Sequence, residues 1–197
     1  MSNYVTMEDF RRTAQLGDLP IDEQAQIALD AAEEAIEDYC GRRFYLDEEP
    51  TTRFYRGVSN GREVWVDDLV SVSTLEGDDD GDGTYETTWT SGDYRLAPYN
   101  ASADGRPYTR IETSPLGTKR FYSHAAAVRL TGIFGWTAVP DRVKQATSLQ
   151  ALRWLKRVRS APLGVEAIVI EGAPVRVRNR VDPDVEVLLA PLRRSAP

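Results

Sequence analysis

A single stretch, Leu130 to Pro162, places the tightest limits on how this chain can fold. It begins with strand-forming residues interrupted by Gly132 and Gly135, and it ends in a basic segment with helical periodicity. Pro140 stands where a proline suits the first helical position, because its missing N–H would have no partner there. The pattern predicts a strand followed directly by a long basic helix within residues 136–162, and hence a mixed chain.

The two sides of this predicted helix differ in character. One arc is apolar and is typical of a core-facing side: Val143, Thr147, Ala151, Trp154, Leu155 and Val158. The opposite arc is basic and carries Arg142, Arg153, Lys156 and Arg157. Leu149 lies in the middle of the basic arc, where it is either a single exposed apolar side chain or a subunit contact.

A second amphipathic helix is predicted over residues 23–40, capped by Asp22 and ended by Gly41. Small alanines on its apolar side would let another helix approach closely. Its other side is acidic and includes Asp30, Glu33, Glu34 and Glu37. This acidic face meets either solvent or a positively charged partner, such as the basic helix of the same chain or of a neighbouring copy. A shorter helix is predicted before it, over residues 7–16.

Between the helices, residues 44–135 alternate with period two in short runs separated by Gly, Asn, Asp and Pro. The predicted strands are Thr52–Tyr55, Glu63–Val66, Val70–Glu76, Tyr85–Thr90, Tyr94–Leu96, Thr109–Glu112 and Ala127–Thr131. They favour an antiparallel sheet or small sandwich inserted into a helical bundle. The aromatic residues that we expect to pack inside it are Trp65, Trp89, Tyr94 and Tyr108, and a carbohydrate-binding platform is the alternative.

The run from Asp78 to Gly83 matches the first half of an EF-hand calcium loop, with Asp78, Asp80 and Asp82 at alternate positions. The twelfth position should hold a bidentate glutamate, but Trp89 stands there and no helix is predicted on either side. We therefore interpret the run as an acidic hairpin tip, and we keep a calcium-binding β module as the alternative.

The C-terminal region, residues 163–197, predicts two short strands over residues 167–170 and 175–178 and then a last helix. Asp182 and Pro183 open this helix, which extends to about residue 190 and is followed by a basic tail. Its apolar side comprises Val185, Leu188, Leu189 and Leu192. From the residues alone this side either folds back on its own core or grips another protein.

Composition excludes several functional classes. The formal net charge is −7, yet the part from Asp141 onward has 11 Lys and Arg against 6 Asp and Glu, so an acidic body precedes a basic end. This balance disfavours wholesale DNA binding and suits docking between opposite charges. Cys40 is the only cysteine and His124 the only histidine, which excludes an internal disulfide and sites with two imidazoles. We find no nucleophile, nucleotide-binding or signal-peptide motif, so the sequence predicts no enzyme, no cofactor, no metal and no membrane contact, and folding in the cytosol.

Several short motifs follow one another from the second helix to the tail. They are Cys40–Phe44, Tyr55–Gly57, Val66–Val72, Thr131–Trp136 with Val139–Pro140, Ser160–Gly164, and Asp182–Val185 with Leu188–Pro191. In order and spacing they resemble the head-to-tail connector, or adaptor, proteins of actinophage-type tailed bacteriophages. The acidic run at Asp78 departs from the pattern as a variable loop tip.

The resemblance implies an α+β fold, a small helical bundle with an inserted antiparallel β-rich region and a short C-terminal helix and tail. It divides the chain into N-terminal helices (1–43), the insertion (44–135), the long basic helix (136–162) and the C-terminal hairpin, helix and tail (163–197). It implies a structural virion protein at the head–tail junction, assembled in the host cytoplasm as a ring of about twelve copies beneath the portal. Double-stranded DNA would pass through the lumen without sequence-specific binding, and a stopper or tail protein would bind below.

The same resemblance assigns the portal contact to the C-terminal elements. The residues concerned are Asp182, Pro183, Val185, Leu188, Leu189, Leu192, Arg193 and Arg194. For the contact between subunits we expect the basic and acidic helix faces to meet, through Leu149, Arg153, Lys156 and Arg157 on one side and Asp30, Glu33, Glu34 and Glu37 on the other. We also expect the segment from Pro183 to Arg194 to order only on the portal.

Overall fold

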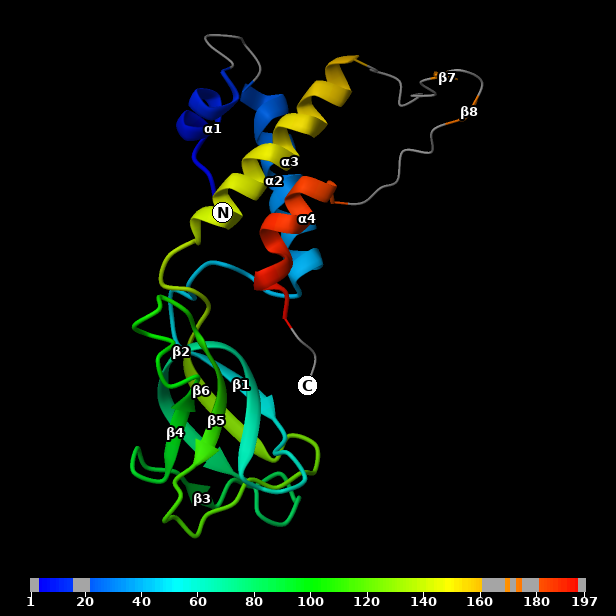
Figure 1. The fold of residues 1–197 in the computed structure, drawn as a ribbon. Coiled ribbons are helices and arrows are strands. Elements are labelled where there is room, and N and C mark those ends of the chain that lie inside the picture. The colour runs from blue at the N-terminus through cyan, green and yellow to red at the C-terminus, as the bar shows by residue number, and fades with distance from the viewer. Residues whose placement is uncertain (1–3, 16–21, 161–168, 171–172, 175–180, 195–197) are drawn as a thin grey trace. The chain divides into compact units, whose positions relative to one another are not determined.

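The computed structural model describes residues 4–15, 22–160, 169–170, 173–174 and 181–194 (Figure 1). The chain forms two compact units. A helical unit combines the residues up to Arg42 with those from Val139 onward, and a β unit spans Arg43–Ala138. The predicted α+β class is confirmed. Among the described residues, no helix combines the length and apolar character needed to cross a bilayer.

In its described residues the helical unit has four α-helices and one 3-10 turn. They are α1 (Met7–Ala14), α2 (Asp22–Cys40), α3 (Asp141–Ser160), α4 (Pro183–Leu189) and η1 (Ala190–Leu192). α2 packs against α3, and both helices carry small residues on the buried side: Ala25, Ala28 and Ala32 on α2, and Ala146, Thr147 and Ala151 on α3. Small side chains let the two axes approach closely, and Leu29, Ile36 and Leu155 are the largest fully buried side chains of these two helices.

The helix ends follow from local chemistry. The Thr6 side chain accepts the Asp9 N–H and caps α1, which ends at Gln15 in a left-handed conformation, slightly earlier than predicted. Gly41, with a φ of 64°, follows α2 and donates its N–H to Glu37 O. α3 begins one residue after Pro140, and α4 has Pro183 in its first turn behind the Asp182 cap.

The β unit is an antiparallel sheet in the order β1-β6-β2-β5-β4, with β3 paired to the end of β2. Its strands are β1 (Thr51–Tyr55), β2 (Glu63–Gly77), β3 (Thr87–Thr88), β4 (Tyr94–Ala97), β5 (Tyr108–Thr113) and β6 (Val128–Phe134). Figure 1 shows the long β2 passing through this unit. Its first part pairs with β5 and the rest pairs with β6.

Three strand predictions need correction. The two strands expected at Glu63–Val66 and Val70–Glu76 are one strand, because bulges let β2 bend and change partners instead of ending. The strand expected over Tyr85–Thr90 shrinks to Thr87–Thr88. β6 continues to Phe134, through Gly132, instead of stopping at Thr131.

The β core gathers apolar residues from every long strand, including Val64, Leu69, Leu75, Ile111 and Leu130. Trp89 is 5% exposed and stacks on Phe121 with ring centroids 4.1 Å apart, and Tyr94 and Tyr108 pack partly buried against the same core. Trp65 does not follow the prediction, since it is 37% exposed. Near the C-terminus, β7 (Val169–Ile170) pairs with β8 (Ala173–Pro174), while the strand predicted over 175–178 lies outside the described residues.

Candidate functional site

The side of α3 that faces away from α2 carries the residues singled out from the sequence. Arg142, Lys156 and Arg157 are exposed on it, and Leu149 is half-buried. The opposite side is the core-facing one, with Val143, Ala151 and Leu155 fully or nearly fully buried. The division into an apolar and a basic arc is therefore present in the folded helix.

Arg153, predicted at a subunit contact, makes ion pairs within its own chain. Its guanidinium pairs with the carboxylates of Asp182 and Asp184 at the start of α4, the latter at 2.8 Å. Gln150, 2% exposed, accepts the Asp182 N–H at 3.1 Å. The acidic N-terminus of α4 is thus held on α3 within one chain, and the charge of Arg153 is already compensated there.

α4 packs on α3 and buries its apolar side. Val185 and Leu189 are completely buried, while Leu188 is half-buried and Val187 is 76% exposed. This corrects two expectations: the segment is folded in the single chain, and Val185 and Leu189 face their own core instead of offering a free apolar surface. The sequence left open whether this side folds back on its own core or binds another protein, and these two residues fold back on the core.

The residues after α4 run beside the end of α2. The Arg194 N–H donates to Cys40 O at 2.8 Å, and the Arg193 guanidinium lies 5.0 Å from the centre of the Tyr39 ring. Both arginine side chains are exposed, as is Pro183. Of the predicted portal-binding residues, the exposed set at this end of the unit is therefore Pro183, Arg193 and Arg194, with Asp182, Leu188 and Leu192 partly accessible.

The acidic face of α2 is divided by the N-terminal segment. The Tyr4 N–H donates to the Glu33 carboxylate, and the Tyr4 hydroxyl donates to Glu37 at 2.6 Å. Tyr4 is 3% exposed, so this segment covers the two glutamates. Burial raises the pKa of Glu33 to about 7, against the hydrogen bond from Tyr4, which lowers it. Glu33 and Glu37, expected at a subunit interface, are thus engaged within the chain.

The rest of the α2 surface forms a separate stripe. Five exposed residues at helical spacing compose it: Glu23, Ile27, Asp30, Glu34 and Asp38. Ile27 is 63% exposed in the middle of this acidic stripe. Ile27 was not among the predicted contact residues, although an isoleucine opposite the alanine-rich side of a helix indicates an exposed apolar residue.

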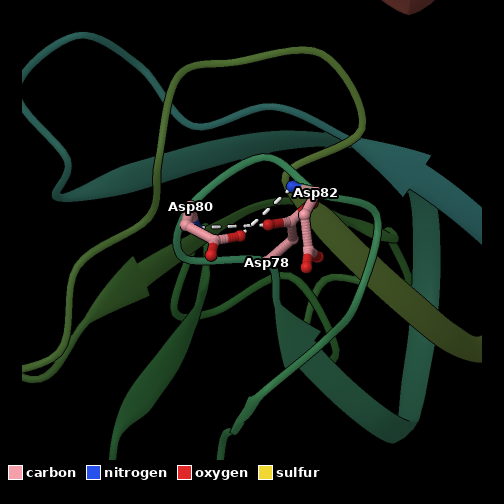
Figure 2. Close-up of side chains that lie close together, drawn as sticks. All are labelled: Asp78, Asp80 and Asp82. Atoms are coloured by element: carbon pink, nitrogen blue, oxygen red, sulfur yellow. Dashed lines mark hydrogen bonds between the residues drawn. The ribbon is translucent and has the colours of Figure 1, made fainter.

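The three aspartates of the Asp78 loop do lie together, with carboxylate oxygens within 4.8 Å of one another (Figure 2). Their hydrogen bonds go to the loop backbone: Asp78 accepts the N–H groups of Asp80, Gly81 and Gly83, and Asp80 accepts that of Asp82. Burial raises the pKa of Asp78, but the bonds from Gly81 and Gly83 outweigh it and the pKa falls below its usual value. The carboxylates therefore stabilise the turn through the loop's own N–H groups.

His124 also serves this loop. Its Nε2 lies 3.0 Å from Asp78 O, and Gly81 lies beside its ring. No serine, cysteine or carboxylate oxygen of the described chain is hydrogen-bonded to the imidazole. The arrangement orders a hairpin tip and offers no nucleophile–base pair.

The β unit also has an open apolar basin of about 810 Å³. Phe54 and Trp65, 55% and 37% exposed, form part of its wall together with Val58, Ala125 and Ala126. Arg56 is the charged residue in this lining. The basin accounts for the exposure of Trp65, which sequence reasoning had placed in the core.

Comparison with known proteins gives one kind of match. No protein-family model and no curated protein matches the sequence. Among solved structures, the neck of an empty gene transfer agent particle, computed with C6 symmetry, contains a chain 18% identical with a TM-score of 0.57, over 98% of this chain and 91% of that chain. The neck of the native particle, computed with C12 symmetry, contains one 21% identical with a TM-score of 0.52, over 100% and 97%.

A chain in the virion of the native particle is 19% identical with a TM-score of 0.53, over 98% and 91%. At these identities the likeness is one of fold, and it extends over nearly the whole chain. The predicted resemblance to head-to-tail connectors is thereby confirmed at the level of the fold.

Proposed function

We propose that this chain is a structural neck protein of a phage-like particle, where it joins the head to the tail. The observation that carries the proposal is the shared fold along nearly the whole chain with proteins from the necks of gene transfer agent particles. The motifs of the sequence support the same role independently.

In this role the copies form a closed ring, and the ring surrounds the channel through which double-stranded DNA leaves the head. Necks computed with sixfold and twelvefold symmetry support a ring, and we propose twelve copies. The portal protein lies above the ring and a stopper or tail protein lies below it. Each copy acts through its shape and its contacts with neighbouring proteins. The acidic body disfavours retention of DNA on the channel wall.

The portal contact is proposed for the accessible part of the C-terminal elements. Arg193 and Arg194 give it positive charge, and Pro183, Leu188 and Leu192 give it apolar area. Val185 and Leu189 leave this set because they hold α4 on its own bundle. The contact therefore docks a helix that is already folded, so little ordering is required on binding.

The test is electron microscopy of particles assembled with and without this protein. We expect a ring at the head exit when the protein is present and tailless heads without that ring when it is absent. Replacing Arg193 and Arg194 with Ala should remove the ring from the portal, whereas Arg56→Ala, an exposed arginine of the β unit, should leave it in place. Tailed, infectious or transducing particles formed without the protein would reject the proposal.

A further inference from the structure

The two helices that form the core of the helical unit each present one stripe of exposed and half-buried residues at the surface. On α2 this is the acidic stripe, Glu23, Ile27, Asp30, Glu34 and Asp38. On α3 we define the basic stripe as Arg142, Gln145, Leu149, Leu152 and Lys156. The residues of the basic stripe are spaced alternately three and four apart, as in the seam of a coiled coil. The acidic stripe has the same spacing between Ile27 and Glu34.

The stripes lie on opposite sides of the unit. α2 and α3 pack on each other, and each has buried alanines: Ala28 and Ala32 on α2, Ala146 and Ala151 on α3. At about 100° per residue each stripe falls opposite the buried side of its own helix. Within one molecule the two stripes therefore point away from each other and cannot meet. The start of α4 contacts α3 through Gln150 and Arg153, which lie beside the basic stripe and are not part of it.

The two surfaces complement each other in charge and in apolar content. The acidic stripe carries four carboxylates around one exposed isoleucine, and Glu23, Glu34 and Asp38 make no ion pair with the described residues. The basic stripe has Arg142 and Lys156 at its two ends and two half-buried leucines between them. Each stripe thus has an apolar centre with charge around it, and the signs are opposite.

We infer that the acidic stripe of one copy binds the basic stripe of the next, with α2 and α3 antiparallel and Ile27 seated against Leu149 and Leu152. Glu34 and Arg142 each lie seven residues, about 10.5 Å, from Ile27 and Leu149, so an antiparallel pair places them level. Glu23 then lies toward Lys156 at the other end. A parallel pair would place Glu34 level with Lys156 and Glu23 toward Arg142 equally well. Lys156 already makes a contact within its own chain, so we choose the antiparallel pair, in which Glu34 meets Arg142.

This inference rests on the proposed neck role and specifies its subunit contact. An interface between two different surfaces of one chain passes from copy to copy in one direction, and it closes into a ring when the rotation allows. It replaces the contact predicted from sequence in two respects. Ile27 becomes the apolar partner of Leu149, and Arg153, Glu33 and Glu37 leave the interface because they serve the chain's own fold.

The test is disulfide trapping in the full chain that carries both Ile27→Cys and Leu149→Cys. The two positions are on opposite sides of one molecule, so oxidation can join them only between copies. Cys40 is 1% exposed and burial raises the pKa of its thiol to about 11, so it does not compete. We expect a ladder of dimers, trimers and larger species on a non-reducing gel, and none from the matched control with Val187→Cys and Leu149→Cys.

A ladder no stronger than that of the control would overturn the pairing of the stripes. This result is separable from failure of the neck role, which electron microscopy tests on its own. Rings at the head exit without a ladder would support the neck role and reject this interface. A ladder that vanishes when Glu34→Arg is added and returns with Arg142→Glu would support the antiparallel alignment, whereas return only with Lys156→Glu would overturn it.

Discussion

At the scale of single residues, Gly132 shows how tightly the β unit is packed. It lies inside β6, opposite Thr51 on one side and Val72 on the other. A Cβ built at this position would collide with the backbone carbonyl of Ser71, and its φ is an ordinary one. The requirement is therefore for space between strands and not for backbone freedom.

We expect Gly132→Ala to lower the free energy of unfolding of the β unit by about 2–4 kcal/mol, because the backbone of β2 must move to admit the methyl group. Urea unfolding followed by tryptophan fluorescence measures the change. Gly92→Ala is the matched control, since a Cβ there meets nothing within 4 Å, and it should shift the midpoint little. Equal effects of the two substitutions would contradict this account.

Glu33 predicts a pH dependence of stability. Its pKa is about 7 in the folded chain against 4.5 for the ordinary group, so the folded state holds the proton more tightly. Stability from this group is fully present below pH 4.5 and is lost as the pH rises from there through 7, by about 2 kcal/mol after allowance for partial solvation. We expect Glu33→Gln to remove this loss between pH 5 and 8, while the exposed neighbour variant Glu34→Gln keeps it. A Glu33→Gln profile that matches the parent would refute the assignment.

At the scale of elements, the helices were predictable because each has its own cap and a clean apolar period. α2 and α3 fall within one or two residues of the predicted ends, apart from the first residues assigned to the basic segment. β2 was not predictable as one strand, since Asp67 and Asp68 interrupt the alternation where the strand bends. Asp68 tolerates that place because it accepts the Trp136 Nε1–H at 2.8 Å, a contact 68 residues away in sequence.

α4 is an element whose stability can be tested directly. Leu189 is fully buried in the single chain, so Leu189→Ala should cost about 2–4 kcal/mol of unfolding free energy. Val187→Ala, at an apolar residue of the same helix that is 76% exposed, should cost less than about 0.5 kcal/mol. Thermal unfolding by circular dichroism of the protein without any partner provides the measurement. If both variants unfold like the parent, α4 is not part of the folded bundle.

The Asp78 loop gives a prediction that separates a structural cluster from a calcium site. Because Asp78 already accepts three backbone N–H groups, Asp78→Ala should lower the melting temperature in buffer that contains a chelator. Asp80→Ala removes one exposed acceptor and should lower it less. Millimolar calcium should leave the melting temperature of the parent unchanged, since Trp89 replaces the bidentate ligand. A large rise with calcium would revive the calcium-binding module.

At the scale of the whole molecule, the sequence predicted an acidic and a basic helix face but not which of their charges remain uncovered in the fold. The basic and acidic helix faces were visible from period and composition alone. Their subdivision was not, because Tyr4 covers Glu33 and Glu37 from a segment about thirty residues away, and Asp182 and Asp184 reach Arg153 from α4. Long-range contacts of this kind decide which charges remain for a partner, and only the fold supplies them.

The interface between two different stripes predicts an unusual result when two defective variants are mixed. Glu34→Arg and Arg142→Glu each place like charges across every contact of a ring built from one variant, at a cost of about 1 kcal/mol per contact that is repeated around the ring. In a ring that alternates the two variants, opposite charges face each other at every contact. Association measured by mass photometry at low salt should therefore be lost in each variant and restored in the equimolar mixture.

An interface that joined identical surfaces would behave differently. If α2 met α2 across a twofold axis, Arg142→Glu would leave association intact by itself, and the parent protein would pair with the Glu34→Arg variant as well as the Arg142→Glu variant does. Alternation also closes only for an even number of copies, which twelve satisfies. Restored complexes should therefore contain the two variants in equal amounts, as native mass spectrometry can count, and an excess of either variant in closed rings would contradict the pairing of Glu34 with Arg142.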